Sequence, residues 1–156
     1  MDRFLVALGL MASIAGCDSK VPPGDPTGAE IWASYGGFCD GPCEQRALYL
    51  DGSTLDFRRT KGDELLDWGD GTLTDAGRTE YEEASAELAG KDTSMLHVCS
   101  PADGIDARVT LADGDTTLDY CILDDVGAPM KRIDTFFDKL LDGIENCSSN
   151  EWVDAC

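Results

Sequence analysis

The stretch LYLDGSTLDF, residues 48–57, places an Asp-Gly pair between two runs of alternating apolar residues. Asp-Gly suits a two-residue β-hairpin turn, because both central residues of that turn need a positive φ. With Asp51 and Gly52 as the turn, Leu48 faces Leu55 across the hairpin. The apolar side chains that then share one side are Leu48, Leu50, Leu55 and Phe57. The stretch therefore predicts a β-hairpin with one buried face.

A second stretch, VTLADGDTTLDY at residues 109–120, repeats this arrangement. With Asp113 and Gly114 as the turn, its apolar residues again share one side: Val109, Leu111, Leu118 and Tyr120. The segment EIWASY, residues 30–35, has a strand pattern and would extend the same sheet.

Each hairpin is followed by a helical pattern. After the second hairpin, a broad apolar stripe with Pro129 near its start predicts a helix: Met130, Ile133, Phe136, Phe137, Leu140, Leu141 and Ile144. The earlier helix is expected at about residues 75–89, with Thr74 as N-cap and a stripe of Tyr81, Ala84 and Leu88. This order predicts an α+β fold, with an antiparallel sheet built from two β-hairpins and two helices packed on one face.

The N-terminus carries a short apolar run, FLVALGLMASI at residues 4–14, followed by Ala15 and Gly16. A membrane-spanning helix needs about 20 apolar residues, so this run is too short to span a bilayer. A short apolar segment that ends in small residues is typical of a secretory signal peptide. We therefore expect residues 1–16 to be a signal peptide.

The residues Ile14-Ala15-Gly16-Cys17 resemble the lipobox of bacterial lipoproteins, in which a branched aliphatic and two small residues precede a cysteine. The resemblance implies cleavage before Cys17, a diacylglyceryl thioether on its sulfur and acylation of its new amine. Two or three acyl chains such as palmitate would anchor the protein, since stable anchoring needs more than one chain. The domain would then belong to the cell envelope, on the inner or the outer membrane, and face the periplasm or the cell surface.

After the lipidated cysteine the composition changes twice. Residues 17–29 are rich in Pro, Gly and Asp and have little to bury, which predicts a tether. Residues 30–156 are long enough for a single compact α+β domain with a modest core, and we expect it to be monomeric.

The protein has seven cysteines, an odd number that calls for an explanation in an exported chain. Assigning Cys17 to lipid leaves six, which an oxidising compartment would pair as disulfides. Six cysteines allow 15 connectivities. Proximity in sequence favours three local bridges, which are Cys39–Cys43, Cys99–Cys121 and Cys147–Cys156.

Residues 36–57, GGFCDGPCEQRALYLDGSTLDF, also resemble a family of small bacterial lipoproteins of unknown function. In that family a Cys-x3-Cys pair precedes a strand, an Asp-Gly turn and a second strand. The resemblance spans residues 35–59 and implies an exported domain with no known activity.

The chain is strongly acidic, with 31 Asp and Glu against 12 Lys and Arg and a net charge of −19. Such a charge disfavours nucleic acid and anionic membrane surfaces as partners and favours a basic protein of the envelope. The densest acidic cluster, in what looks like a Gly-rich connection, ends at Asp75 and supplies the candidate contact: Asp63, Glu64, Asp67 and Asp70. The cluster does not match a calcium-binding loop, so no metal and no cofactor are expected.

The sequence offers little for catalysis. His97 is the only histidine, and no nucleophile motif or Gly-rich phosphate loop accompanies it. We therefore expect no catalytic residue and a non-catalytic binding or structural module. Two alternatives are an inhibitor of a cationic exported enzyme and a thiol–disulfide oxidoreductase. The second would use Cys39 and Cys43, although their Cys-x3-Cys spacing differs from the Cys-x2-Cys redox motif.

Overall fold

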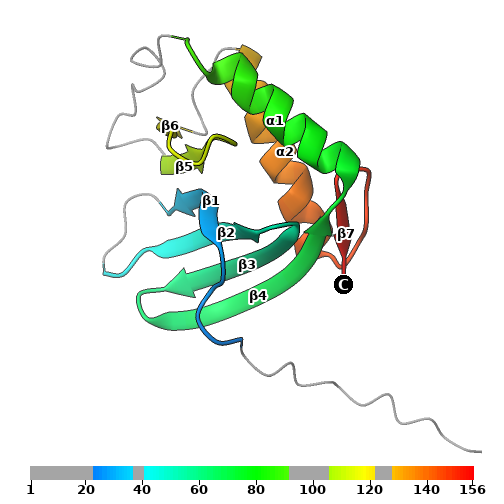
Figure 1. The fold of residues 1–156 in the computed structure, drawn as a ribbon. Coiled ribbons are helices and arrows are strands. Elements are labelled where there is room, and N and C mark those ends of the chain that lie inside the picture. The colour runs from blue at the N-terminus through cyan, green and yellow to red at the C-terminus, as the bar shows by residue number, and fades with distance from the viewer. Residues whose placement is uncertain (1–22, 37–40, 92–105, 122–127) are drawn as a thin grey trace, which may run out of the picture.

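The computed structural model describes residues 23–36, 41–91, 106–121 and 128–156 (Figure 1). They form an antiparallel seven-stranded sheet with two helices and a disulfide bond. The elements in chain order are β1 (Ala29–Tyr35), β2 (Glu44–Asp51), β3 (Thr54–Lys61), β4 (Glu64–Leu73), α1 (Asp75–Leu88), β5 (Asp106–Thr110), β6 (Thr117–Cys121), α2 (Ala128–Glu145) and β7 (Val153–Ala155). The strand order is β6-β5-β1-β2-β3-β4-β7, so the α+β class is confirmed.

Strand β1 joins the two halves of the sheet. Trp32 pairs with Val109 of β5 on one side and with Leu48 of β2 on the other. The predicted strand at residues 30–35 is therefore present, in the middle of the sheet.

The first hairpin, β2–β3, has a different register from the one expected. Asp51 pairs with Thr54, so Gly52 and Ser53 form the turn, and Gly52 supplies the positive φ, 63°. Leu48 consequently pairs with Phe57 instead of Leu55. The register moves by two residues, and strand side chains alternate with a period of two, so the predicted face is unchanged. Leu48, Leu55 and Phe57 are buried and Leu50 packs against them.

The second hairpin, β5–β6, has the predicted register, with Val109 opposite Leu118. Its paired strands end at Thr110 and Thr117, which leaves a longer connection than the two-residue turn expected. Asp113 shapes this connection, because its Oδ1 accepts hydrogen bonds from the amides of Asp115 (3.0 Å) and Thr116 (2.8 Å).

The sheet contains more than two hairpins, which corrects the sequence prediction. The acidic segment expected to be a connection is mostly strand β4, which pairs with β3 from Glu64 to Thr72 with one register shift. Gly62 and Asp63 form the turn between them. Strand β7 then pairs with the last residues of β4, from Gly71 to Leu73.

Both predicted helices are present. The Thr74 side chain accepts a hydrogen bond of 3.0 Å from the Gly77 amide, which is the expected N-cap of α1. Helix α2 contacts the sheet through Phe137, whose ring lies 6.3 Å from that of Trp32. Helix α1 packs on α2 through Tyr81, whose ring stacks on Phe136 at 5.8 Å. In the described part of the chain, neither helix is long and apolar enough to cross a membrane.

Candidate functional site

Several of the predicted site residues lie outside the described part of the chain. These are Cys17, Cys39 and Cys99, together with His97, so the lipidation site and two of the expected disulfides are not described. Cys43 is disulfide-bonded, and strand β2 begins at the next residue. Cys121 is the last residue of β6.

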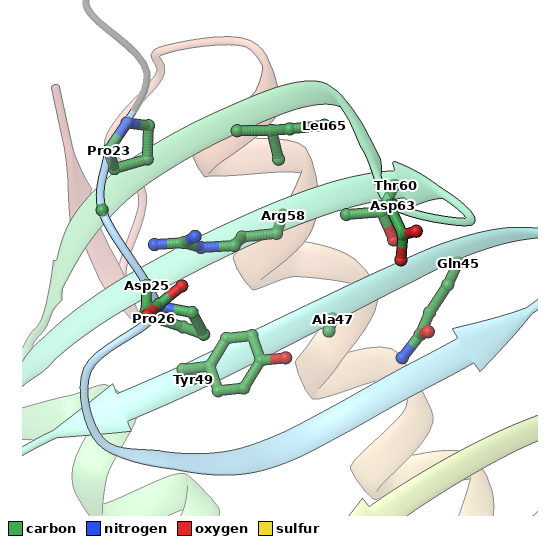
Figure 2. A pocket seen from close by; sticks show the side chains of 11 residues that line it. Pro23, Asp25, Pro26, Gln45, Ala47, Tyr49, Arg58, Thr60, Asp63 and Leu65 are labelled. Atoms are coloured by element: carbon green, nitrogen blue, oxygen red, sulfur yellow. The ribbon is translucent and has the colours of Figure 1, made fainter.

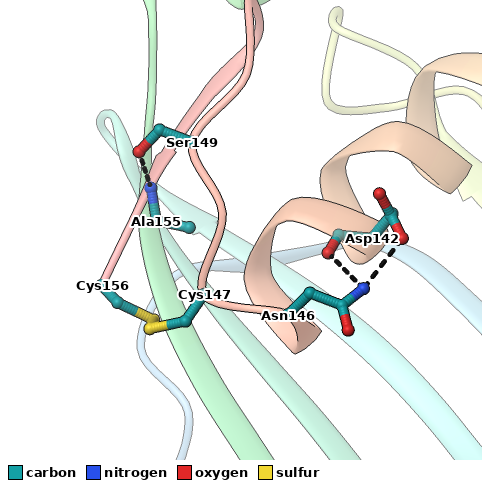
Figure 3. Close-up of a disulfide and its surroundings, with 6 residues drawn as sticks. All are labelled: Asp142, Asn146, Cys147, Ser149, Ala155 and Cys156. Carbon is teal, nitrogen blue, oxygen red and sulfur yellow. Dashed lines mark hydrogen bonds between the residues drawn. A yellow bond between two sulfur atoms is a disulfide. The ribbon is translucent and has the colours of Figure 1, made fainter.

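The Cys147–Cys156 disulfide closes the C-terminal segment, with the two Cα atoms 5.3 Å apart (Figure 3). Both cysteines have a positive φ, 52° and 56°. Within the loop that the disulfide closes, the Ser149 hydroxyl accepts a hydrogen bond of 3.1 Å from the Ala155 amide. This bridge therefore joins the end of helix α2 to the end of strand β7.

The four acids singled out as a contact do not converge on one point. Asp63 lies in the β3–β4 turn, and the other three lie along β4, which rises about 3.3 Å per residue. Asp70 pairs with Asp56 and so shares a face with Arg58, whereas Asp67 pairs with Arg59 on the opposite face. Asp63, Glu64, Asp67 and Asp70 are all exposed. The acids therefore follow one strand on both of its faces.

Strand β4 has a partly open outer edge. Strand β7 pairs only with Gly71–Leu73, and in the described part of the chain no strand pairs with the outer side of residues 64–70. The register shifts between Arg59 and Thr60, where Leu66 has no partner on β3. Leu66 is 37% exposed and is the exposed large hydrophobic residue of the described chain.

A hollow of about 340 Å³ lies beside this edge, between β4 and the C-terminal disulfide. Phe57 and Ile144 give it apolar walls, and Asp67 and Glu145 contribute carboxylates, of which Glu145 is paired with Arg46. Asp67 lies 3.9 Å from Arg59 in a loose ion pair, and its side chain remains 53% exposed. The hollow thus combines an apolar wall with negative charge.

A larger hollow, of about 620 Å³, lies on the face of the sheet that carries Arg58 (Figure 2). Ala47, directly opposite Arg58 in the sheet, leaves room between larger neighbours such as Gln45 and Tyr49. Arg58 is 9% exposed and donates two hydrogen bonds to Asp56, of 3.0 and 2.8 Å. These bonds raise the pKa of the Arg58 guanidinium, so this buried cation stays charged. Sequence reasoning missed Arg58, and a charged residue in the middle of a predicted strand was the available signal.

The same hollow shows how the N-terminal segment enters the domain. Pro23, Asp25 and Pro26 lie across the sheet beside Arg58 and Tyr49 (Figure 2). Pro23 also lines a smaller hollow with Trp68 and Asp70. This part of the predicted tether therefore lies against the domain.

A series of buried hydrogen bonds, which the sequence did not predict, connects β1, β6 and α2. The Trp32 indole donates to the Tyr120 hydroxyl (3.2 Å), which donates to Asp134 Oδ1 (2.8 Å). Burial raises the pKa of Asp134, and the hydrogen bond from Tyr120 partly opposes that shift. Burial likewise raises the pKa of Tyr120. One turn further along α2, burial raises the pKa of Asp138, with the charge of Asp134 adding to the effect.

The partly buried charged groups described above are held by neighbouring side chains. Asp134 is engaged by Tyr120, and Arg58 by Asp56. In the part of the chain that the structure describes, no three His, Cys, Asp or Glu residues are grouped so that they would hold a metal ion. The exposed features are the acidic strand β4 with its open edge and the two hollows beside it.

The chain matches no protein-family model, no curated protein and no solved structure. Its resemblance to bacterial lipoproteins stays a prediction that rests on residues 14–17 and 35–59.

Proposed function

We propose that this chain is a lipoprotein of the bacterial cell envelope, anchored through Cys17, whose α+β domain is a non-catalytic binding module for a basic envelope protein. The lipobox-like residues before Cys17 support the anchor. The Cys147–Cys156 disulfide supports an oxidising compartment.

The observation that carries the binding role is the position of the acids on β4. Glu64, Asp67 and Asp70 are exposed along a strand whose outer edge, from residue 64 to residue 70, has no partner strand among the described residues. Helices α1 and α2 would cover one face of the sheet, so the β4 edge and the Arg58 face remain for a partner. Complementary charge would speed the encounter with a basic protein and make the binding sensitive to salt.

The proposal also limits the distance between the domain and the membrane. Pro23 already lies against the sheet, so only residues 18–22 separate the domain from Cys17. Five extended residues reach about 17 Å. The partner would therefore be a protein bound to, or close to, the same membrane.

The anchor is tested by a Cys17→Ser variant, fractionated beside the wild-type chain after a high-salt wash. We expect the variant to leave the membrane fraction and to lose incorporation of labelled palmitate. A variant that stays in the washed membranes would contradict the anchor.

The binding role is tested by recovering partners from envelope extract at low and high salt. A variant with Asn at positions 63, 67 and 70 and Gln at position 64 should recover less of the salt-sensitive partner. The matched control changes four exposed acids outside β4: Asp51, Glu82, Asp115 and Asp154. Equal losses in both variants would mean that overall charge, and not β4, determines binding. If the partner is a cationic enzyme whose activity falls on binding, the inhibitor alternative is supported.

A further inference from the structure

The outer side of strand β4 carries backbone groups that no strand in the described part of the chain pairs with. The Leu73 amide donates a hydrogen bond of 2.8 Å to the Ser53 carbonyl, so the backbone groups of Leu73 point toward β3. The backbone amide and carbonyl of successive residues point to opposite sides of a strand. Those of Gly69 and Gly71 therefore also point toward β3. Those of Trp68, Asp70 and Thr72 point to the outer side of β4. Thr72 is paired with Asp154 of β7. The outward groups of Trp68 and Asp70 have no strand beside them in the described part of the chain. The Trp68 amide instead donates a hydrogen bond of 3.0 Å to Oδ1 of Asp67, so the Trp68 carbonyl and the Asp70 backbone are the groups that an added strand would meet.

Strand β7 covers only the last residues of β4. β7 runs alongside β4 as far as Ala155, which pairs with Gly71. The next residue, Cys156, has a φ of 56° and is bonded to Cys147. Cys156 therefore leaves the strand geometry of β7 and is tied to the residue near the end of α2, so β7 does not pair with Asp70.

The charges along the edge determine which strand fits there. A second copy pairing through β4 would bring Glu64, Asp67 and Asp70 against the same acids, and like charges across a strand pair are unfavourable. Acidic side chains and an irregular register are devices that keep sheet edges from self-pairing. A basic strand meets no such repulsion and gains opposite-charge pairs.

The hollow beside the edge fits one side chain of such a strand. Phe57 and Ile144 would contact the aliphatic stem of a lysine or arginine, while Asp67, whose side chain is 53% exposed, lies near its charged head. Exposed Leu66 offers an apolar contact further along the same strand.

We propose that the outer edge of β4, from Glu64 to Asp70, binds an extended segment of the partner by strand addition, and that this segment alternates Lys or Arg with apolar residues. Main-chain hydrogen bonds to the Trp68 carbonyl and to the Asp70 amide and carbonyl would hold the added strand, and the β4 acids would select its charge. This inference rests on the proposed function and specifies its mode of recognition.

The probe is a synthetic twelve-residue peptide that alternates lysine with valine and threonine, titrated into the full chain in detergent. Its control has the same sequence with every second backbone amide methylated, which keeps the charge but removes donors from one edge. We expect the first peptide to bind and to slow hydrogen exchange at the amide of Asp70, and the methylated peptide to do neither. Equal binding of both peptides would overturn strand addition.

Two substitutions at one position separate backbone pairing from charge. Asp70→Pro removes the outward amide at an edge where proline is tolerated, whereas Asp70→Asn keeps the amide and removes the charge. We expect Asp70→Asn to weaken the affinity for the first peptide about two- to threefold. Asp70→Pro should weaken it about tenfold or more. Equal effects would mean that charge alone acts.

Failure of this inference is distinguishable from failure of the proposed function. If the first peptide does not bind but a salt-sensitive envelope partner is still recovered, strand addition is wrong and the binding module remains. If the chain does bind the first peptide but recovers no envelope partner, the proposed partner class is wrong. Exchange protection of β2 and β3 amides in each variant shows that the sheet is intact.

Discussion

Tyr120 donates a hydrogen bond of 2.8 Å to Asp134 and accepts one from Trp32, so a single hydroxyl joins β6, α2 and β1. Tyr120 is 1% exposed and Trp32 is 3% exposed. A buried polar group that loses its partner bears the full cost of its desolvation. The position of α2 on the sheet therefore depends on the two hydrogen bonds of the Tyr120 hydroxyl as well as on apolar packing.

Removing the Tyr120 hydroxyl should destabilise the domain. Tyr120→Phe leaves the Trp32 indole without its acceptor and Asp134 without its donor, so the free energy of unfolding should fall by about 1–3 kcal/mol. Urea unfolding at pH 7 measures the change. A loss below about 0.3 kcal/mol would show that the chain of hydrogen bonds contributes no net stability.

Replacing Asp134 should change how stability depends on pH. Burial raises the pKa of the folded Asp134 carboxyl above its unfolded value, so its contribution is present at low pH and is lost as pH rises through the folded pKa. Asp134→Asn keeps an oxygen acceptor for Tyr120 and cannot ionise. Relative to the wild type, the variant should gain stability as pH is raised from about 4 to 7. A parallel pH profile for the two proteins would contradict the shift.

Arg132 of α2 connects the two helices and should also make stability pH-dependent, with the opposite sign. Its guanidinium lies 2.7 Å from Glu80, 2.9 Å from Glu83 and 3.3 Å from Glu87. The hydrogen bond from Arg132 lowers the pKa of Glu80. A lowered pKa contributes stability above the unfolded value, and that contribution is lost as pH falls through the folded pKa.

Arg132→Ala should therefore lower the free energy of unfolding modestly at pH 7, since each exposed ion pair contributes little but three of them here share one cation. The difference between the variant and the wild type should shrink toward pH 3. The matched control is Lys131→Ala, an exposed cation on the preceding residue. Thermal unfolding at both pH values decides the outcome, and an equal effect of the two substitutions would mean that the cluster adds nothing specific.

The contact between Gly69 and Ile144 shows why β4 was missed in the sequence. A Cβ at position 69 would lie 2.6 Å from Ile144 Cγ2, so α2 can approach β4 only because glycine stands there. Gly71 has the same role next to Val153. These inward positions carry no apolar side chain, so β4 lacks the alternation that marks β2 and β3 as strands.

That contact also yields a prediction. Gly69→Ala should cost about 1–3 kcal/mol, because the added methyl overpacks the space under Ile144. Ile144→Leu removes the Cγ2 atom with little change in volume, so the double variant should recover part of the loss. Gly24→Ala is the control, since nothing lies within 4 Å of a Cβ there. If the losses of the two single variants simply add in the double variant, the structure accommodates the added methyl by moving atoms other than Ile144 Cγ2.

Other parts of the fold were predictable because the signal was local. The stripe of α2 and the Thr74 cap of α1 depend on neighbouring residues, and both are observed. The face of the first hairpin was correct although its turn was not, because a shift of two residues preserves the alternation. The Arg58 hollow was not predictable, since it depends on Pro23 returning across the sheet from a distant part of the chain.

The Cys147–Cys156 disulfide should stabilise the pairing of β7 with β4 more than it stabilises the domain against global unfolding. Its closed loop is short, with a sequence separation of 9, and the loop-entropy account gives about 2–3 kcal/mol for a loop of this size. Replacing both cysteines with serine should therefore lower the free energy of unfolding by about that amount. Because β7 pairs only with Gly71–Leu73, its local release should raise hydrogen exchange at Thr72 well before exchange at Leu48 in β2. Exchange measured residue by residue in the wild type and the double variant tests this order.

The same double variant also tests strand addition. A released β7 would lengthen the open edge of β4. The double variant should therefore bind the alternating lysine peptide at least as tightly as the wild type. Weaker binding in the double variant, with β2 and β3 still protected, would mean that the peptide needs the hollow beside the disulfide more than it needs the edge.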